Sequence, residues 1–160
     1  MPVVLTDPLA NNKTVVLSSL GFQNATLEAA NDQAGNPAVN ALNDSTFDYW
    51  GQSGSLETRL RKVGGIGLLD VNACGVSGHN LGTTGSTFFV RYSDNGTTWS
   101  NATPSYAPLT DEDIFFIFPR RAHLFWELAF GGSSGAYVSN VKMGLRLDFP
   151  CTPIEGYRPV

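Results

Sequence analysis

One short segment limits the fold of this chain more than any other. Residues 88–99 read FFVRYSDNGTTW, and the first half alternates in side-chain character as a half-buried β-strand does. Asn95 and Gly96 follow, and both tolerate a positive φ, so the pair is a strong signal for a hairpin turn. Two threonines and Trp99 then resume a β-favouring sequence. The segment therefore predicts a β-hairpin in an all-β domain.

Strand signals recur along the rest of the chain. Residues 23–39 read as a mostly polar loop, with room for two short helical turns at 24–31. Side-chain alternation and turn spacing together predict eight strands, at residues 15–21, 47–52, 56–63, 66–76, 86–93, 114–118, 123–130 and 137–147. The later strands carry the aromatic residues expected between two packed sheets: Phe115, Phe116, Phe118, Phe125, Trp126 and Phe130. The pattern predicts a β-sandwich.

Composition narrows the class of protein. The chain has 160 residues, which is most simply one domain, and its net charge of −4 argues against a nucleic-acid partner. No apolar stretch approaches the ~20 residues that a membrane span needs. Residues 1–8 lack the basic start and apolar run of a secretion signal. Cys74 and Cys151 could pair, although two such thiols are more often free and buried.

One motif invites an enzymatic interpretation. Residues 131–135 read GGSSG and match the Gly-x-Ser-x-Gly nucleophile motif letter for letter. That motif needs a strand, a strained turn and a helix, with an acid and a histidine further along the chain. Both His79 and His123 precede it, and the sequence that follows is strand-like, so we expect a hairpin loop. With no other nucleophile–base pair or metal cluster in the sequence, we predict a protein that is not an enzyme and has no cofactor.

The order of the motifs resembles the discoidin, or coagulation-factor C-type, domain, a galactose-binding-like jelly roll. Residues 43–50 (NDSTFDYW) stand where that family carries Asp-Gly-x-x-x-Thr-x-Trp. Residues 92–99 (YSDNGTTW) match its Tyr-Ser-x-(Asp/Asn)-Gly-x-x-Trp hairpin, and residues 123–130 and 138–147 resemble its closing strand pair. The resemblance implies a jelly-roll β-sandwich of about eight antiparallel strands.

We accordingly divide the chain into three parts. Residues 1–14 are expected to form an N-terminal arm, residues 15–148 the sandwich, and residues 149–160 a proline-rich C-terminal tail. Three prolines prevent regular ladder pairing in the tail. Its apolar side chains suit either docking on a neighbouring subunit or packing on the sandwich itself: Phe149, Ile154, Tyr157 and Val160.

The resemblance also implies where ligands would bind. In sugar-binding relatives, the loop that corresponds to residues 76–85 hydrogen-bonds a glycan, and His79 and Asn80 have side chains that both donate and accept. Tyr49 and Tyr137 are the aromatic residues suited to a sugar platform. The alternative is an ordinary polar connection that its glycines keep open.

The sequence contains two alternative sets of candidate calcium ligands. Asp44 and Asp48 lie in the early motif, although Asn43-Asp44 replaces the family's Asp-Gly and Asp48 replaces its threonine. The acidic run at residues 111–113 offers oxygen ligands as well, but it lacks the alternating spacing of a calcium loop.

Two functions are expected. The first is a non-enzymatic phage virion protein of the tail tip or baseplate, because the chain also resembles small tail proteins. Such a protein would contact other virion proteins and copies of itself, and it would bind a host-surface glycan as well. The alternative is a stand-alone carbohydrate-binding module, extracellular or at a cell surface, that recognises a glycan through the loop around His79.

Overall fold

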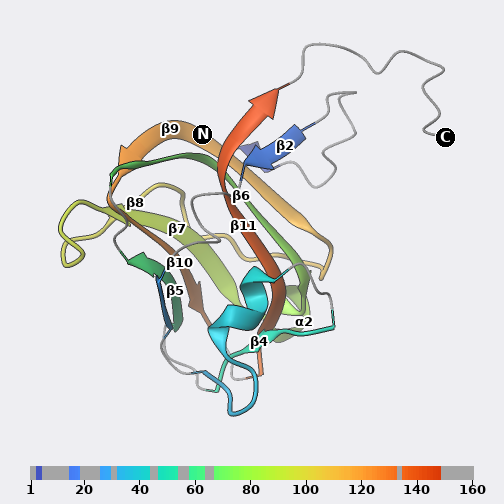
Figure 1. Ribbon diagram of the computed structural model, residues 1–160. Helices are drawn as coiled ribbons and strands as arrows, with labels where there is room; N and C mark the ends of the chain where they lie inside the picture. The colour runs from blue at the N-terminus through green and yellow to red at the C-terminus, as the bar shows by residue number, and fades with distance from the viewer. Residues whose placement is uncertain are drawn as a thin grey trace, which may run out of the picture.

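The structure, a computed structural model, describes residues 3–4, 15–18, 26–29, 32–43, 47–53, 58–63, 67–132 and 135–148. These residues form two antiparallel β-sheets packed face to face, which confirms the predicted all-β sandwich (Figure 1). In the described residues no helix is long and apolar enough to cross a membrane.

The first sheet has the strand order β1-β9-β6-β11-β2, and β4 pairs with β11 as well. Its strands are β1 (Val3–Val4), β2 (Val15–Ser18), β4 (Trp50–Gly51), β6 (Leu69–His79), β9 (Ile114–His123) and β11 (Tyr137–Asp148). β1 belongs to the segment expected as an arm, and it pairs with β9 by placing Val3 opposite Ile117.

The second sheet has the order β3-β5-β10-β7-β8. Its strands are β3 (Thr26–Ala29), β5 (Thr58–Val63), β7 (Thr87–Ser93), β8 (Ser100–Asn101) and β10 (Phe125–Gly131). Two short helices, η1 (Ala38–Leu42) and α2 (Leu81–Thr84), lie at the end of the sandwich where β6 ends and β11 begins (Figure 1).

The core lies between the two sheets. All five residues from Trp126 to Phe130 of β10 are buried, and the large apolar side chains of Trp126, Leu128 and Phe130 belong to the core. The ring of Phe88 packs edge-on against Phe116 at a centroid distance of 4.9 Å. Six aromatic residues were expected in this core. Four of them are buried there, whereas Phe115 and Phe125 are only half-buried.

The helical turns expected at residues 24–31 are wrong. Residues Thr26–Ala29 form β3, which pairs with β5 by placing Leu27 opposite Lys62. A neighbouring strand supplies hydrogen bonds that a short isolated helix cannot match, so tertiary pairing overrides local propensity. The strand expected at residues 47–52 is also shorter, because only Trp50–Gly51 pairs with β11.

The predicted hairpin is present but has a wider turn. β7 and β8 pair with Tyr92 opposite Ser100, and the loop between them spans residues 94–99. Gly96 has the expected positive φ, 71°. The Ser93 hydroxyl accepts the N–H groups of Asn95 and Gly96, at 3.2 and 2.9 Å. These side-chain bonds hold a six-residue loop where the Asn-Gly pair alone predicted a tighter one.

Two further predictions concern the Cys74–Cys151 pair and the C-terminal tail. Cys74 is a free, buried thiol, and burial raises its pKa to about 12. Cys151 lies outside the described residues, so a pairing of the two stays a prediction. The tail, with Phe149, Ile154, Tyr157 and Val160, also lies outside them.

Candidate functional site

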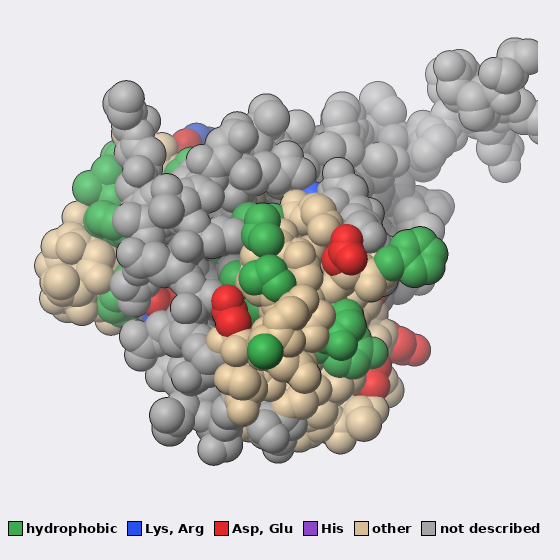
Figure 2. Space-filling model, turned by 60° about the horizontal axis from the view of Figure 1, so that its bottom comes forward, with side chains coloured by type: hydrophobic (Ala, Val, Ile, Leu, Met, Phe, Trp, Pro, Cys, Tyr) green, Lys and Arg blue, Asp and Glu red, His purple; other side chains and the backbone are tan. Residues whose placement is uncertain are grey.

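An open hollow of about 410 Å³ lies where β6 ends and β11 begins. Its lining residues are Tyr49, Gly78, His79, Tyr137 and Ser139. β6 and β11 are paired there, with Val138 opposite His79. The C-terminal end of β11 is at the other end of the molecule, so the hollow faces away from it (Figure 1). Figure 2 shows the hollow's end of the molecule, where apolar side chains gather among polar surface.

Two tyrosines form one side of the hollow. The rings of Tyr49 and Tyr137 are 5.1 Å apart and inclined at 50°, and Tyr137 is 37% exposed. Their backbones are held in place by asparagine side chains. Asn40 donates to the carbonyl of Tyr49 at 3.0 Å, and Asn80 accepts the N–H of Tyr137 at 2.7 Å. The two rings are thus a fixed aromatic surface that is partly open to solvent.

His79 forms a wall of the hollow and is uncharged. Its side chain is only 3% exposed, and its Nδ1 accepts the N–H of Leu81 at 3.3 Å. Nε2 must therefore carry the proton, which it donates to the carbonyl of Glu112 at 2.9 Å. Burial lowers the pKa of His79, and this outweighs the opposing effects of the Glu112 carbonyl and of Asp111 and Asp113. The ring is a neutral, fixed group with both nitrogens engaged by backbone.

Ser139 supplies a buried hydroxyl to the hollow. The residue is 4% exposed, and its hydroxyl has no hydrogen-bond partner among the described residues. A Cβ on Gly78 would lie 2.9 Å from the Ser139 Cβ and 3.0 Å from its Oγ. Gly78 also has a φ of +59°, which side-chain-bearing residues rarely adopt. Glycine at this position keeps the Ser139 hydroxyl uncovered, and buried polar groups without a protein partner call for an explanation such as a ligand.

The hydroxyls of Tyr49 and Tyr137 are unused as well, because neither bonds to any residue that the structure describes. The hollow therefore offers three hydroxyl groups beside two aromatic rings. Each hydroxyl can donate one hydrogen bond and accept others. This combination suits a ligand that carries several hydroxyl groups on an otherwise apolar ring.

The structure brings three of the four residues expected at a sugar site to this hollow: Tyr49, His79 and Tyr137. Asn80 does not line the hollow. Its amide donates to the carbonyl of Gly135 at 2.9 Å, and its side-chain oxygen accepts the N–H of Tyr137, so Asn80 positions the start of β11. Sequence reasoning missed Ser139. Its position two residues after Tyr137 on one strand was the available signal. The binding role of all these residues stays a prediction.

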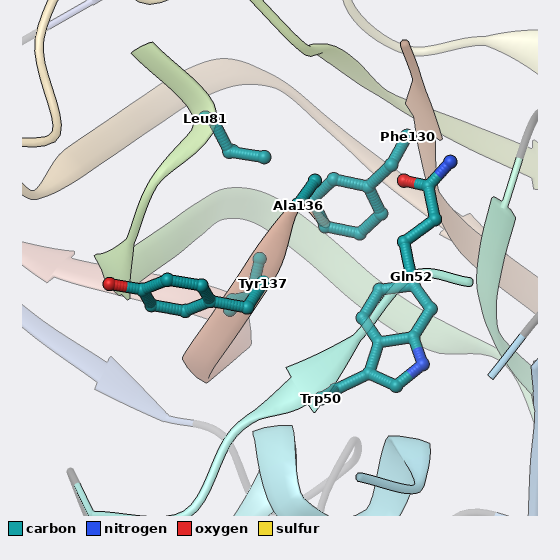
Figure 3. A pocket seen from close by; sticks show the side chains of 7 residues that line it. Trp50, Gln52, Leu81, Phe130, Ala136 and Tyr137 are labelled. Atoms are coloured by element: carbon teal, nitrogen blue, oxygen red, sulfur yellow. The ribbon is translucent and has the colours of Figure 1, made fainter. Parts of the chain in front are cut away.

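A second, much smaller cavity lies under Tyr137. Its volume is about 10 Å³, and Figure 3 shows the Tyr137 hydroxyl turned away from its other lining residues. Trp50, Gln52, Leu81, Phe130, Ala136 and Val138 complete the lining. Because a single water needs about 10–15 Å³ of such volume, this space is too small for an organic ligand.

The acidic residues considered for calcium are engaged with neighbouring groups. Asp111 accepts the N–H and the hydroxyl of Thr83, at 2.9 and 2.6 Å, which fixes α2. Asp48 accepts from the Asn43 amide at 3.2 Å, and Asp44 lies outside the described residues. Within the described part of the chain, no group of three His, Cys, Asp or Glu side chains is arranged to hold a metal ion. Calcium binding stays a prediction.

Comparison by sequence found no match, either among models of known families or among curated proteins. Comparison by structure found carbohydrate-binding modules. A pectin-binding module has a TM-score of 0.61 at 13% identity, over 82% of this chain and 93% of the module. Chitosan-binding module 1 of a Paenibacillus sp. IK-5 chitosanase/glucanase has 0.57 at 19% identity, over 75% and 94%.

A family 32 carbohydrate-binding module of Clostridium perfringens, solved with GalNAc-β-1,3-galactose, has a TM-score of 0.61 at 12% identity, over 84% of this chain and 96% of the module. At such identities the likeness shows the fold. It confirms the predicted galactose-binding-like, discoidin-type jelly roll. The virion setting gains no support from these structures and stays a prediction.

Proposed function

We propose that this domain binds a glycan, without catalysing its breakdown, in the hollow between the ends of β6 and β11. One observation carries the proposal: the buried Ser139 hydroxyl, which has no partner in the described part of the chain, lines a hollow with two tyrosine rings. The fold supports it, because solved structures of the same fold include modules for pectin, chitosan and a galactose-containing disaccharide.

The chemistry of the hollow matches that of a sugar. A sugar ring presents C–H groups on its faces and hydroxyls at its edge. The rings of Tyr49 and Tyr137 would pack against a face, since aromatic surfaces contribute apolar contact area. The Ser139 hydroxyl would pair with a hydroxyl at the edge. The volume of about 410 Å³ also falls within the ~300–1,000 Å³ typical of ligand sites.

The same geometry argues against hydrolysis at this site. Glycoside hydrolysis uses a pair of carboxyl groups that flank the scissile bond, and none of the five residues that line the hollow is acidic. A serine nucleophile, as in ester hydrolysis, would need a base within hydrogen-bond reach. His79 is the histidine that lines the hollow, but both of its nitrogens are engaged by the backbone of Leu81 and Glu112. Ser139 therefore has no activating histidine here, which fits a site that binds its ligand unchanged.

The setting of this activity is a further part of the proposal. A glycan-binding domain would act outside the cell or at a cell surface. A place in a phage tail would add contacts through the chain ends, and the hollow would then attach the tail to a host glycan. The binding proposal does not depend on that setting.

A glycan array followed by calorimetry would test the proposal. For a glycan found on the array, we expect Ser139→Ala and Tyr137→Ala each to weaken binding about tenfold or more, roughly 1.4 kcal/mol. Leu68→Ala is the control, because Leu68 is 61% exposed and lies at the opposite end of the sandwich. Binding that both hollow variants leave intact would overturn the proposed site, and an array without any bound glycan would overturn the function.

A further inference from the structure

Four acidic residues lie next to residues that line the hollow. Asp48 adjoins Tyr49 in the sequence and is exposed. Asp111, Glu112 and Asp113 are exposed too, on the loop whose Glu112 carbonyl accepts from His79 at 2.9 Å. Asp111 and Asp113 flank Glu112 in the sequence, so the contact of Glu112 with His79 places both near the hollow, and their charges oppose the lowering of the His79 pKa. We call these four residues the acidic rim.

No Lys or Arg is among the five residues that line the hollow. Arg120 and Arg121 are at the far end of β9, next to the start of β6, and Arg120 pairs with Asp70 at 2.6 Å. Arg91 pairs with the buried Glu127 on the second sheet. Figure 2 faces the end that carries the hollow, and the coloured part of that surface shows several Asp and Glu side chains and little Lys or Arg.

The rim is held in place. The hydroxyl and the N–H of Thr83 bond the carboxylate of Asp111, and they lower the pKa of that carboxyl. The Asn43 amide donates to Asp48 at 3.2 Å. Both carboxylates are thus held near the hollow. That of Asp111 stays ionised in mildly acidic solution, where the amines of hexosamines are protonated.

The floor of the hollow points to a ligand independently of the rim. Ser139 is 4% exposed and lacks a hydrogen-bond partner among the residues described, so its hydroxyl is available to a bound molecule. A ligand that reaches this hydroxyl lies against the two tyrosines and His79, next to the acidic rim. Any charge on that ligand would then interact with the rim.

We infer that the hollow selects glycans by charge, preferring those with free amines over neutral ones and excluding those with carboxylates. The inference rests on the proposed function, and it adds the chemical class of the ligand. Each exposed ion pair at the rim changes affinity by up to about fivefold. Over several rim charges we expect an amine-bearing glycan to bind about tenfold more tightly than a carboxylate-bearing one at low salt. The difference should fade at ~1 M salt, where the screening length is about 3 Å.

Three oligosaccharides of equal length test this inference: one of glucosamine, one of N-acetylglucosamine and one of galacturonic acid. Calorimetry on the whole chain at low salt should give affinities in the order amine, neutral, carboxylate. The double variant Asp48→Asn/Asp113→Asn should reduce the spread to about twofold. Asp94→Asn is the matched control, because Asp94 is an exposed carboxylate at the hairpin end, 2.8 Å from His123, and it should leave the order unchanged.

The outcomes separate the inference from the function on which it rests. Binding that Ser139→Ala weakens, but that is equal for amine and carboxylate, would overturn charge selection and leave the glycan site standing. Binding of the amine glycan that survives both Ser139→Ala and Tyr137→Ala would be attraction to an acidic surface, and it would overturn the inference. Absence of binding by all three sugars would overturn it as well, and only a negative glycan array would extend that failure to the proposed function.

Discussion

Two buried serines lie at opposite ends of this sandwich, and they differ in what their hydroxyls do. Ser93, at the hairpin end, is 2% exposed and accepts the N–H groups of Asn95 and Gly96 while it bonds the Asn95 side chain at 3.1 Å. Ser139, at the hollow end, is equally buried and has no partner in the described residues. The first hydroxyl holds a loop, whereas the second remains available to a ligand.

The surrounding side chains repeat this contrast. At the hairpin end, the rings of Tyr92 and His123 stack at 3.9 Å, Arg121 donates to the Tyr92 hydroxyl at 3.1 Å, and His123 contacts Asp94 at 2.8 Å. At the hollow end, the tyrosine hydroxyls bond none of the described residues. The hydroxyls of Ser93 and Tyr92 are satisfied by the fold itself, whereas those of the serine and the two tyrosines at the hollow have no partner among the described residues. Binding surfaces are expected to differ from structural ones in this way.

The largest expected effect comes from Gly78. Gly78→Ala should destabilise the fold by about 1–2 kcal/mol for its left-handed backbone and by about 1–3 kcal/mol more for crowding Ser139. Gly85→Ala is the control, because Gly85 has a similar φ of +64° but open space around its Cβ position. Urea unfolding measures both. Equal losses of unfolding free energy in the two variants would mean that crowding against Ser139 adds no cost at Gly78.

A smaller effect distinguishes the two serines. Ser93→Ala should lower the free energy of unfolding by about 1 kcal/mol, because two backbone N–H groups lose their acceptor. Ser139→Ala should leave it unchanged or raise it slightly, since the hydroxyl it removes is buried without a protein partner among the described residues. Thermal unfolding of both variants checks the comparison. A clear loss for Ser139→Ala would show that its hydroxyl has a structural role.

Acid should lower both the stability of the fold and the glycan affinity of the hollow through His79. The folded state lowers the pKa of His79 below its ordinary 6.5, so the unfolded chain binds the proton first as pH falls. Stability is then full above pH 6.5 and declines below it, and glycan affinity declines in the same window. The Asp111 carboxyl, whose pKa is lowered from 3.8, adds its loss only below that value. Urea midpoints measured against pH should show the first decline in the unaltered chain and a smaller one in His79→Gln.

The sequence predicted the sandwich better than it predicted the site. The alternate burial of Phe88 and Val90 in β7 and the Asn95–Gly96 turn follow from local signals, which a single chain displays directly. β3 was missed because its hydrogen bonds come from β5, whose pairing no local pattern reveals. Asn80 was expected to bind a ligand, but its amide donates to a backbone carbonyl 55 residues away.

The site depends on such distant contacts. Tyr49 and Tyr137 meet because β4 pairs with β11, and this pairing joins segments that are far apart in the sequence. The only sequence signal for Ser139 was its position two residues after Tyr137, because a serine in a strand is ordinary until its lack of partners among the described residues is known. The role of Gly78 likewise depends on the facing strand. The residue types indicated the chemistry of the site, but only the register of the paired strands shows which of these residues meet.

The smallest effect concerns the tyrosine hydroxyls, which Phe substitutions remove while they keep the rings. Tyr92→Phe should cost about 0.5 kcal/mol of stability, since the exposed Arg121 loses its acceptor, and it should leave glycan affinity unchanged. Tyr137→Phe should leave stability unchanged and weaken binding a few-fold, because its hydroxyl serves no described residue. Urea unfolding and calorimetry on both variants give two free energies of unfolding and two glycan affinities. If both variants lose stability and neither loses affinity, the two ends are alike, and the hollow is only an irregular part of the surface.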